Sequence, residues 1–231
     1  FLLFAVKDTG EDEVRVTKLA SLKMTLPSVI IEQTKIEVSS MVTMIEDVFL
    51  KLEESLKEKD KIAKYNDSIV EAEDKLDLYE KEIYDSNFSL LSKSLSKELI
   101  EDTRMNLLTC DEYETIGDYQ NRIANRLYML YENSIELDET RAKMTFKLHS
   151  LTVELFNDIS RAARTGEKEL YPIGIKKYQI LKTYYKEVKR EHFSRSENIP
   201  ARLNTGYLDI INYYKRIADH IYNIIEYVMK I

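Results

Sequence analysis

The chain has 231 residues, of which 32 % are charged, and its formal net charge is −7. This acidic balance argues against nucleic acid as a partner, because a phosphate backbone attracts basic surfaces. A single cysteine, Cys110, excludes a disulfide framework and suits a reducing compartment.

The sequence contains no apolar run that approaches the roughly 20 residues of a bilayer-spanning helix. The longest candidate, FLLFAV at 1–6, also lacks the basic region of a signal peptide. The chain begins with Phe1 rather than Met, so we expect it to be a fragment of a longer protein. Contact with a membrane is then expected only through a region upstream of Phe1.

In chain order, residues 1–27 are interpreted as a linker or extended entry segment, with VRVTKL at 14–19 as a short extended stretch. Pro27 and Ser28 then open a helix, because apolar residues recur every three to four positions from Val38 to Leu52. The same periodicity predicts further helices over roughly 61–91, 96–133, 138–164 and 172–196, and from Pro200 onward. Gly166 is a typical residue to follow the end of the fourth helix.

Six long helices joined by short connectors predict an all-α fold, and their number suits two three-helix bundles. The presence of only 5 glycines and 3 prolines agrees with such long elements. We place the first bundle at 28–135 and the second at 136–231. The similarity of IGDYQNRIAN at 116–125 to IADHIYNIIE at 217–226 supports a duplicated three-helix unit.

Pairs of carboxylates border the apolar faces of two of these helices. Glu114 and Asp118 are four residues apart on the third helix, as Glu73 and Asp77 are on the second. Like charges at this spacing repel, and partial burial adds a desolvation cost unless a cation is bound. Four such side chains facing one another would suit a divalent metal ion. A solvated helix face is the alternative, because the chain has 41 acidic residues.

Two neighbours of these acids have structural interpretations. Gly117 lies in the middle of the third helix, where glycine costs about 1 kcal/mol relative to alanine, so it predicts the close approach of another helix. Cys110 lies on the same row as Glu114 and is expected to be a buried structural thiol.

Four segments resemble one protein family. EYETIGDYQNRIA at 112–124 resembles the D/E-x-E-R-x-G-D-x-x-x-N-I-A signature of PhoU-type domains, and AEDKLD at 72–77 resembles their E-x-x-x-D helix. LDIINYYKRIADHIYNI at 208–224 and LPSVIIEQTKIEVSSM at 26–41 are similar to the last helix and entry segment of the PhoU-like region attached to bacterial Na+/phosphate cotransporters. The resemblance covers roughly residues 20–230.

This resemblance implies two three-helix bundles in the cytoplasm that regulate phosphate uptake. It also implies a divalent metal, such as iron, zinc or magnesium, on Glu73, Asp77, Glu114 and Asp118, with Glu112 as an extra ligand. Two positions depart from the family pattern: an arginine is replaced by Thr115, and an asparagine by Arg122.

The second bundle departs further from that pattern. Tyr178 and Lys182 stand where the family has Glu and Asp, and Lys215 replaces the Glu that precedes Asp219. A protonated lysine cannot ligate a metal but can neutralise a neighbouring acid. We therefore predict that Lys182 or Lys215 pairs with Asp219, and that this bundle holds no metal.

The leading interpretation is a non-enzymatic regulatory domain that belongs to a Na+/phosphate cotransporter-family protein at the inner face of the membrane. Its expected partners are the membrane domain of a transporter, in the same or another chain, and a second copy of itself. A carboxylate-bridged metalloenzyme and a metal-free helical scaffold are the alternatives. The three histidines (His149, His192 and His220) form no E-x-x-H pair, which argues against a ferritin-like di-iron enzyme.

Overall fold

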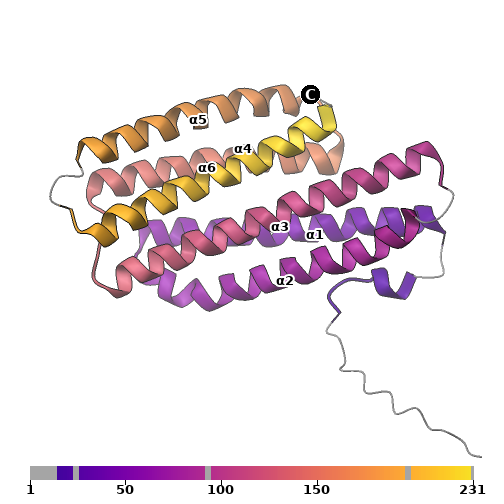
Figure 1. The fold of residues 1–231 in the computed structure, drawn as a ribbon, viewed down its shortest axis with the longest axis horizontal. Helices are drawn as coiled ribbons and strands as arrows, with labels where there is room; N and C mark the ends of the chain where they lie inside the picture. Colours follow the sequence, from indigo (N-terminus) through magenta and orange to yellow (C-terminus); the bar gives the residue numbers. More distant parts are fainter. Residues whose placement is uncertain (1–14, 23–25, 92–94, 196–198, 230–231) are drawn as a thin grey trace, which may run out of the picture.

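A computed structural model describes residues 15–22, 26–91, 95–195 and 199–229. Within these residues the chain forms one short 3-10 helix and six long α-helices (Figure 1). They are η1 (Leu19–Leu22), α1 (Pro27–Lys57), α2 (Asp60–Leu91), α3 (Lys97–Glu132), α4 (Glu139–Thr165), α5 (Leu170–Ser194) and α6 (Ala201–Met229). The all-α prediction is confirmed: every helix begins within a few residues of its expected start, and the four helices with a predicted end also end within a few residues of it.

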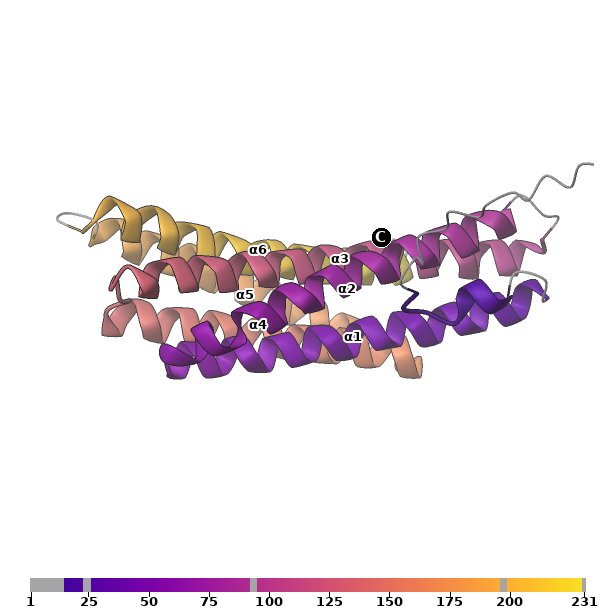
Figure 2. The same cartoon turned by 90° about the horizontal axis from the view of Figure 1, so that it is seen from below.

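The helices form two antiparallel bundles that lie side by side along their length, α1–α3 in one and α4–α6 in the other (Figure 1). Between the bundles, α3 and α6 share the largest contact, and α1 also packs on α4. At one end, the start of α1, the end of α2 and the start of α3 extend beyond the second bundle (Figure 2). The predicted boundary between the bundles, at 135–136, falls in the connector between α3 and α4.

Local signals in the sequence explain where several helices begin and end. Proline occupies the first position of α1, where its missing N–H costs nothing. Side-chain oxygens of Ser96 and Asp138 accept hydrogen bonds from backbone N–H groups in the first turns of α3 and α4. Gly166 follows α4 with φ 77°, the left-handed conformation that glycine adopts without strain.

The centre of the first bundle depends on a close approach between α2 and α3. A Cβ atom at Gly117 would lie 2.3 Å from Cδ1 of Leu76, which is itself 1 % exposed. The close approach predicted from the mid-helix glycine is therefore confirmed. It also brings the acidic flanks of α2 and α3 together.

The segment before α1 differs from its expected form. Residues 15–18 are irregular and lead into η1, so the described part of 14–19 contains no strand, while Val14 and FLLFAV lie outside the described residues. The backbone N–H groups of Val16 and Thr17 donate to the Glu82 carboxylate at 2.8 and 3.0 Å. A carboxylate on α2, rather than a neighbouring strand, thus satisfies these donors.

Among the helices that the structure describes, none combines the length and the apolar character that crossing a bilayer requires.

Candidate functional site

Six carboxylates line the seam where α2 and α3 meet, and we call them the acidic seam. They are Glu73, Asp77 and Glu80 on α2, and Asp111, Glu114 and Asp118 on α3. Two pairs of carboxylates interact across the helices: the charge of Asp77 acts on Glu114, and that of Asp111 acts on Glu80. The structure thus brings the four predicted metal ligands onto one seam, together with Glu80 and Asp111.

Burial and mutual repulsion raise the pKa values of this cluster. Partial burial, followed by the charge of Glu80, raises the pKa of Glu114 to about 7. Burial also raises the pKa of Glu73 and of Asp77, and neighbouring carboxylates add to both effects. The seam is therefore short of positive charge, and a bound cation would relieve that deficit.

Asp118 differs from the other members because it has a cation of its own. Nε and Nη2 of Arg122 lie 2.9 and 2.8 Å from the two carboxylate oxygens of Asp118, one helical turn away. The Arg122 guanidinium also lies over the ring of Tyr119. Arg122, which replaces the family's asparagine, would therefore compete with a metal ion for Asp118.

The donor chemistry of the acidic seam fits a hard divalent cation, since all six groups supply carboxylate oxygens. As the side chains stand, no three His, Cys, Asp or Glu residues in the described ranges are gathered closely enough to hold a metal ion. The Asp77 side chain is partly exposed to solvent, so packing does not surround it on every side. A metal on Glu73, Asp77, Glu114 and Asp118 thus stays a prediction that requires side-chain movement.

Glu112, expected as an extra ligand, lies elsewhere. Its side chain points from α3 towards α6 and is only 4 % exposed. It accepts hydrogen bonds from Asn223 and Tyr227 and contacts Nδ1 of His220 at 2.7 Å. The expectation was wrong because Glu112 and Glu114 lie on different flanks of the helix. His220, Asn223 and Tyr227 share one face of α6. Three polar side chains at this helical spacing could have indicated a buried polar residue opposite them, which is Glu112.

The second bundle has an ion pair where the family pattern places carboxylates. Nζ of Lys215 contacts Oδ1 of Asp219, and the Tyr178 hydroxyl donates to the same oxygen at 2.7 Å. Lys182 and Lys215 also lie 5.8 and 5.7 Å from the centre of the Tyr178 ring, which stacks on Tyr222. The predicted pairing of a lysine with Asp219 is confirmed, and Lys215 forms it.

Two other histidines and the cysteine have structural contacts in the core. His149 contacts the Tyr214 hydroxyl at 3.0 Å in the core, and His192 lies between Arg141 and Asn204. Cys110 is buried against Met41, and burial raises the pKa of its thiol, in agreement with the structural role expected of it.

Fold and site together define an all-helical protein of two three-helix bundles, with an acidic seam in the first bundle and a Lys–Asp pair in the second. Family comparison gives a match to the PhoU domain over residues 38–127 and 146–228. The chain therefore belongs to the PhoU domain family.

Two solved structures share this fold. The phosphate transport system regulatory protein PhoU from Streptococcus pneumoniae superposes with a TM-score of 0.76 at 19 % identity, covering 88 % of this chain and 95 % of that one. PhoU from Pseudomonas aeruginosa gives a TM-score of 0.78 at 17 % identity, covering 86 % and 94 %. No curated protein matches the sequence.

Proposed function

We propose that this chain is a non-enzymatic regulatory domain of phosphate transport. The observation that carries the proposal is the PhoU family match, which extends over both bundles. The solved relative from S. pneumoniae is described as a regulatory protein of a phosphate transport system. The segments at 26–41 and 208–224, which resemble the region attached to Na+/phosphate cotransporters, favour a cytoplasmic position at the inner face of the membrane.

The mechanism we propose is docking on the membrane domain of the transporter, which is part of the same polypeptide or of a separate one. The end of the first bundle that extends beyond the second supports this (Figure 2). Large apolar side chains are exposed there just before α1, near the end of α2 and near the start of α3, including Leu26 at 70 %, Phe88 at 72 % and Ile100 at 44 %. Exposed apolar surface of this kind is typical of interaction sites. Self-association through the same surface is the competing use.

We further propose that the acidic seam takes up one divalent ion, such as iron, zinc or magnesium. Glu73, Asp77 and Glu114 would supply the oxygens, with Asp118 available once Arg122 moves away. The raised pKa values of the first three carboxylates support this proposal. The bound ion would neutralise the seam and tie α2 to α3.

A metal-free helical scaffold is the second candidate, and the Arg122–Asp118 ion pair favours it because that pair already neutralises one carboxylate. A carboxylate-bridged metalloenzyme is the third. The acidic seam contains no histidine, and the cleft lined by Val38, Met105 and Ile224 contains none of the six carboxylates. Metal analysis combined with redox and hydrolase assays separates these candidates from the regulatory one.

Docking is tested by co-expressing the tagged chain with the membrane domain of a Na+/phosphate cotransporter and purifying from detergent-solubilised membranes. We expect the two to co-purify, and Phe88→Asp to abolish recovery. Ile180→Asp, which alters a similarly exposed residue on α5, should leave recovery unchanged. Equal recovery of the membrane domain with both variants would contradict docking through this end of the bundle.

A further inference from the structure

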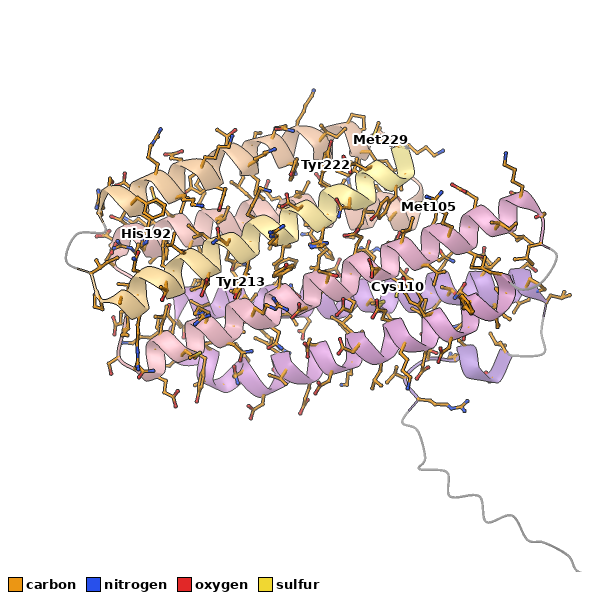
Figure 3. All side chains as sticks on the ribbon, viewed as in Figure 1. Met105, Cys110, His192, Tyr213, Tyr222 and Met229 are labelled. Atoms are coloured by element: carbon orange, nitrogen blue, oxygen red, sulfur yellow. The ribbon has the colours of Figure 1, made fainter. Side chains whose placement is uncertain are left out.

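A cleft of about 460 Å³ lies at the interface between the two bundles, near the ends of α4 and α6. Its floor is the groove between α1 and α3, with Val38, Val42 and Met105, and its walls come from α4, α5 and α6. Met105 is labelled in Figure 3, on the part of α3 that faces the end of α6 near Met229. The cleft is therefore formed only when both bundles are in place.

Small residues on α4 leave this space open. Ala162 and Ala163 line the cleft where α4 ends, and Ile224 and Val228 of α6 line it from another side. Most of the lining is apolar, as in ligand-binding pockets, and the volume lies within the range such pockets have.

One polar group in the lining lacks a partner. Tyr113 is 1 % exposed, and among the described residues none lies within hydrogen-bond distance of its hydroxyl. A buried hydroxyl without a partner costs roughly 1–3 kcal/mol, so a ligand that reaches the Tyr113 hydroxyl from the cleft would supply a hydrogen bond that it lacks.

Positive charge lies beside this hydroxyl. The Arg164 guanidinium lines the same cleft and, within the described residues, contacts one oxygen of Glu46, at 3.3 Å. Besides burial, which raises the pKa of Tyr113, the charge of Arg164 lowers this pKa and the charge of Glu46 raises it. A guanidinium has five N–H donors, so Arg164 retains donors for a further acceptor. Lys35 and Lys168 are the other cations of the lining, which also includes two carboxylates, Glu101 and Asp102. Lys35 pairs with Asp102 at 3.4 Å.

We infer that this cleft binds a small amphipathic molecule with an apolar chain and an anionic oxygen head group. The chain lies along Val38, Val42 and Met105, and the head group accepts hydrogen bonds from Tyr113 and Arg164. Because α1, α3, α4 and α6 all contribute, the ligand bridges the two bundles. This inference is independent of the acidic seam and of phosphate regulation.

The test is a calorimetric titration of the full chain with decanoate, decyl phosphate and decanol below their aggregation concentrations. We expect saturable binding of the two anions at one site per chain, and weaker binding of decanol. Ala163→Trp fills the cleft from an exposed backbone position and should abolish binding. Ala63→Trp, at an exposed alanine on α2, is the matched control and should bind normally.

Two further variants test the head group. Tyr113→Phe removes only the unpartnered hydroxyl, so it should fold at least as well as the original chain while binding both anions roughly fivefold to tenfold more weakly. Arg164→Gln should weaken anion binding and leave decanol unaffected. No saturable binding of any probe, or equal binding by Ala163→Trp and Ala63→Trp, overturns the site. Equal affinity for decanol and decanoate, unchanged by Arg164→Gln, overturns the anionic head group.

Discussion

Nδ1 of His220 lies 2.7 Å from Oε2 of Glu112, and this contact joins α6 to α3 at the interface between the two bundles. Asn223 and Tyr227 donate to the same carboxylate, so one buried side chain of the first bundle holds three residues of the second. A buried carboxylate is tolerated only when its hydrogen bonds are satisfied, and here α6 satisfies them. The relative position of the bundles therefore depends on Glu112.

Glu112→Ala should lower the free energy of unfolding by about 2–4 kcal/mol, because three α6 side chains lose their common acceptor. Urea denaturation followed by circular dichroism measures the loss. The matched control is Glu132→Ala, which removes an exposed carboxylate from the same helix and should change stability by less than about 0.5 kcal/mol. Equal effects of the two substitutions would show that the α3–α6 contact does not depend on this network.

Gly117→Ala should destabilise the protein by about 1–2 kcal/mol, although alanine favours helix by about 1 kcal/mol elsewhere. The reason is the 2.3 Å distance that a Cβ atom would have from Leu76. A double-mutant cycle provides the control: in a Leu76→Ala background, the same glycine substitution should be neutral or stabilising. A stabilising Gly117→Ala in the original chain would mean that α2 and α3 are further apart than described.

His149 should make stability depend on pH. Burial lowers the pKa of His149 from its ordinary 6.5 to about 4, so the unfolded chain takes up this proton at a higher pH than the folded one. Its contribution is fully present above pH 6.5 and is lost as the pH falls from 6.5 towards 4, up to about 3 kcal/mol. The charges of Glu53 and Lys57 modify this shift in opposite directions: Glu53 raises the pKa of His149, and Lys57 lowers it.

Urea denaturation at several pH values between 4 and 7 measures this contribution. His149→Gln should be less stable than the original chain at pH 7, because its contact with Tyr214 is altered, but should show a flatter pH dependence. Identical slopes in both proteins would exclude His149 as the source of acid sensitivity.

Metal binding should depend on the acidic seam and be limited by Arg122. With Mg²⁺, Fe²⁺ or Zn²⁺ we expect one ion per chain by equilibrium dialysis and elemental analysis, lost in the Asp77→Asn/Glu114→Gln double variant. Arg122→Gln should bind the ion more tightly, because Asp118 loses its competing cation. Asp47→Asn, on the exposed face of α1, is the control. Unchanged metal content in the double variant would favour the metal-free scaffold.

Local signals in the sequence predicted the helices well, because Pro27, Ser96, Asp138 and Gly166 act within one turn of the chain. Gly117 was also informative, since a glycine inside a helix has few explanations other than close packing. The pairing of Lys215 with Asp219 followed from their spacing of one turn.

Features that depend on tertiary contacts could not be predicted from local sequence signals. Glu112 is separated from its α6 partners by more than a hundred residues, and the relative rotation of the helices decides which carboxylate faces which neighbour. The same rotation placed Glu80 and Asp111 in the acidic seam and left the Tyr113 hydroxyl without a hydrogen-bond partner among the residues that the structure describes. The conformation of residues 15–22 depends on the distant Glu82, so propensity alone suggested the wrong form.

Phosphate uptake by a Na+/phosphate cotransporter membrane domain, with and without this chain, tests the central claim most directly. The measurement is sodium-dependent entry of radiolabelled phosphate into cells that lack other phosphate carriers, after growth in low and in high phosphate. If the chain regulates transport, the uptake rate should fall after growth in high phosphate when the chain is present, and omission of residues 26–229 should remove that response. Equal rates and equal responses with and without this region would contradict a regulatory role in phosphate transport.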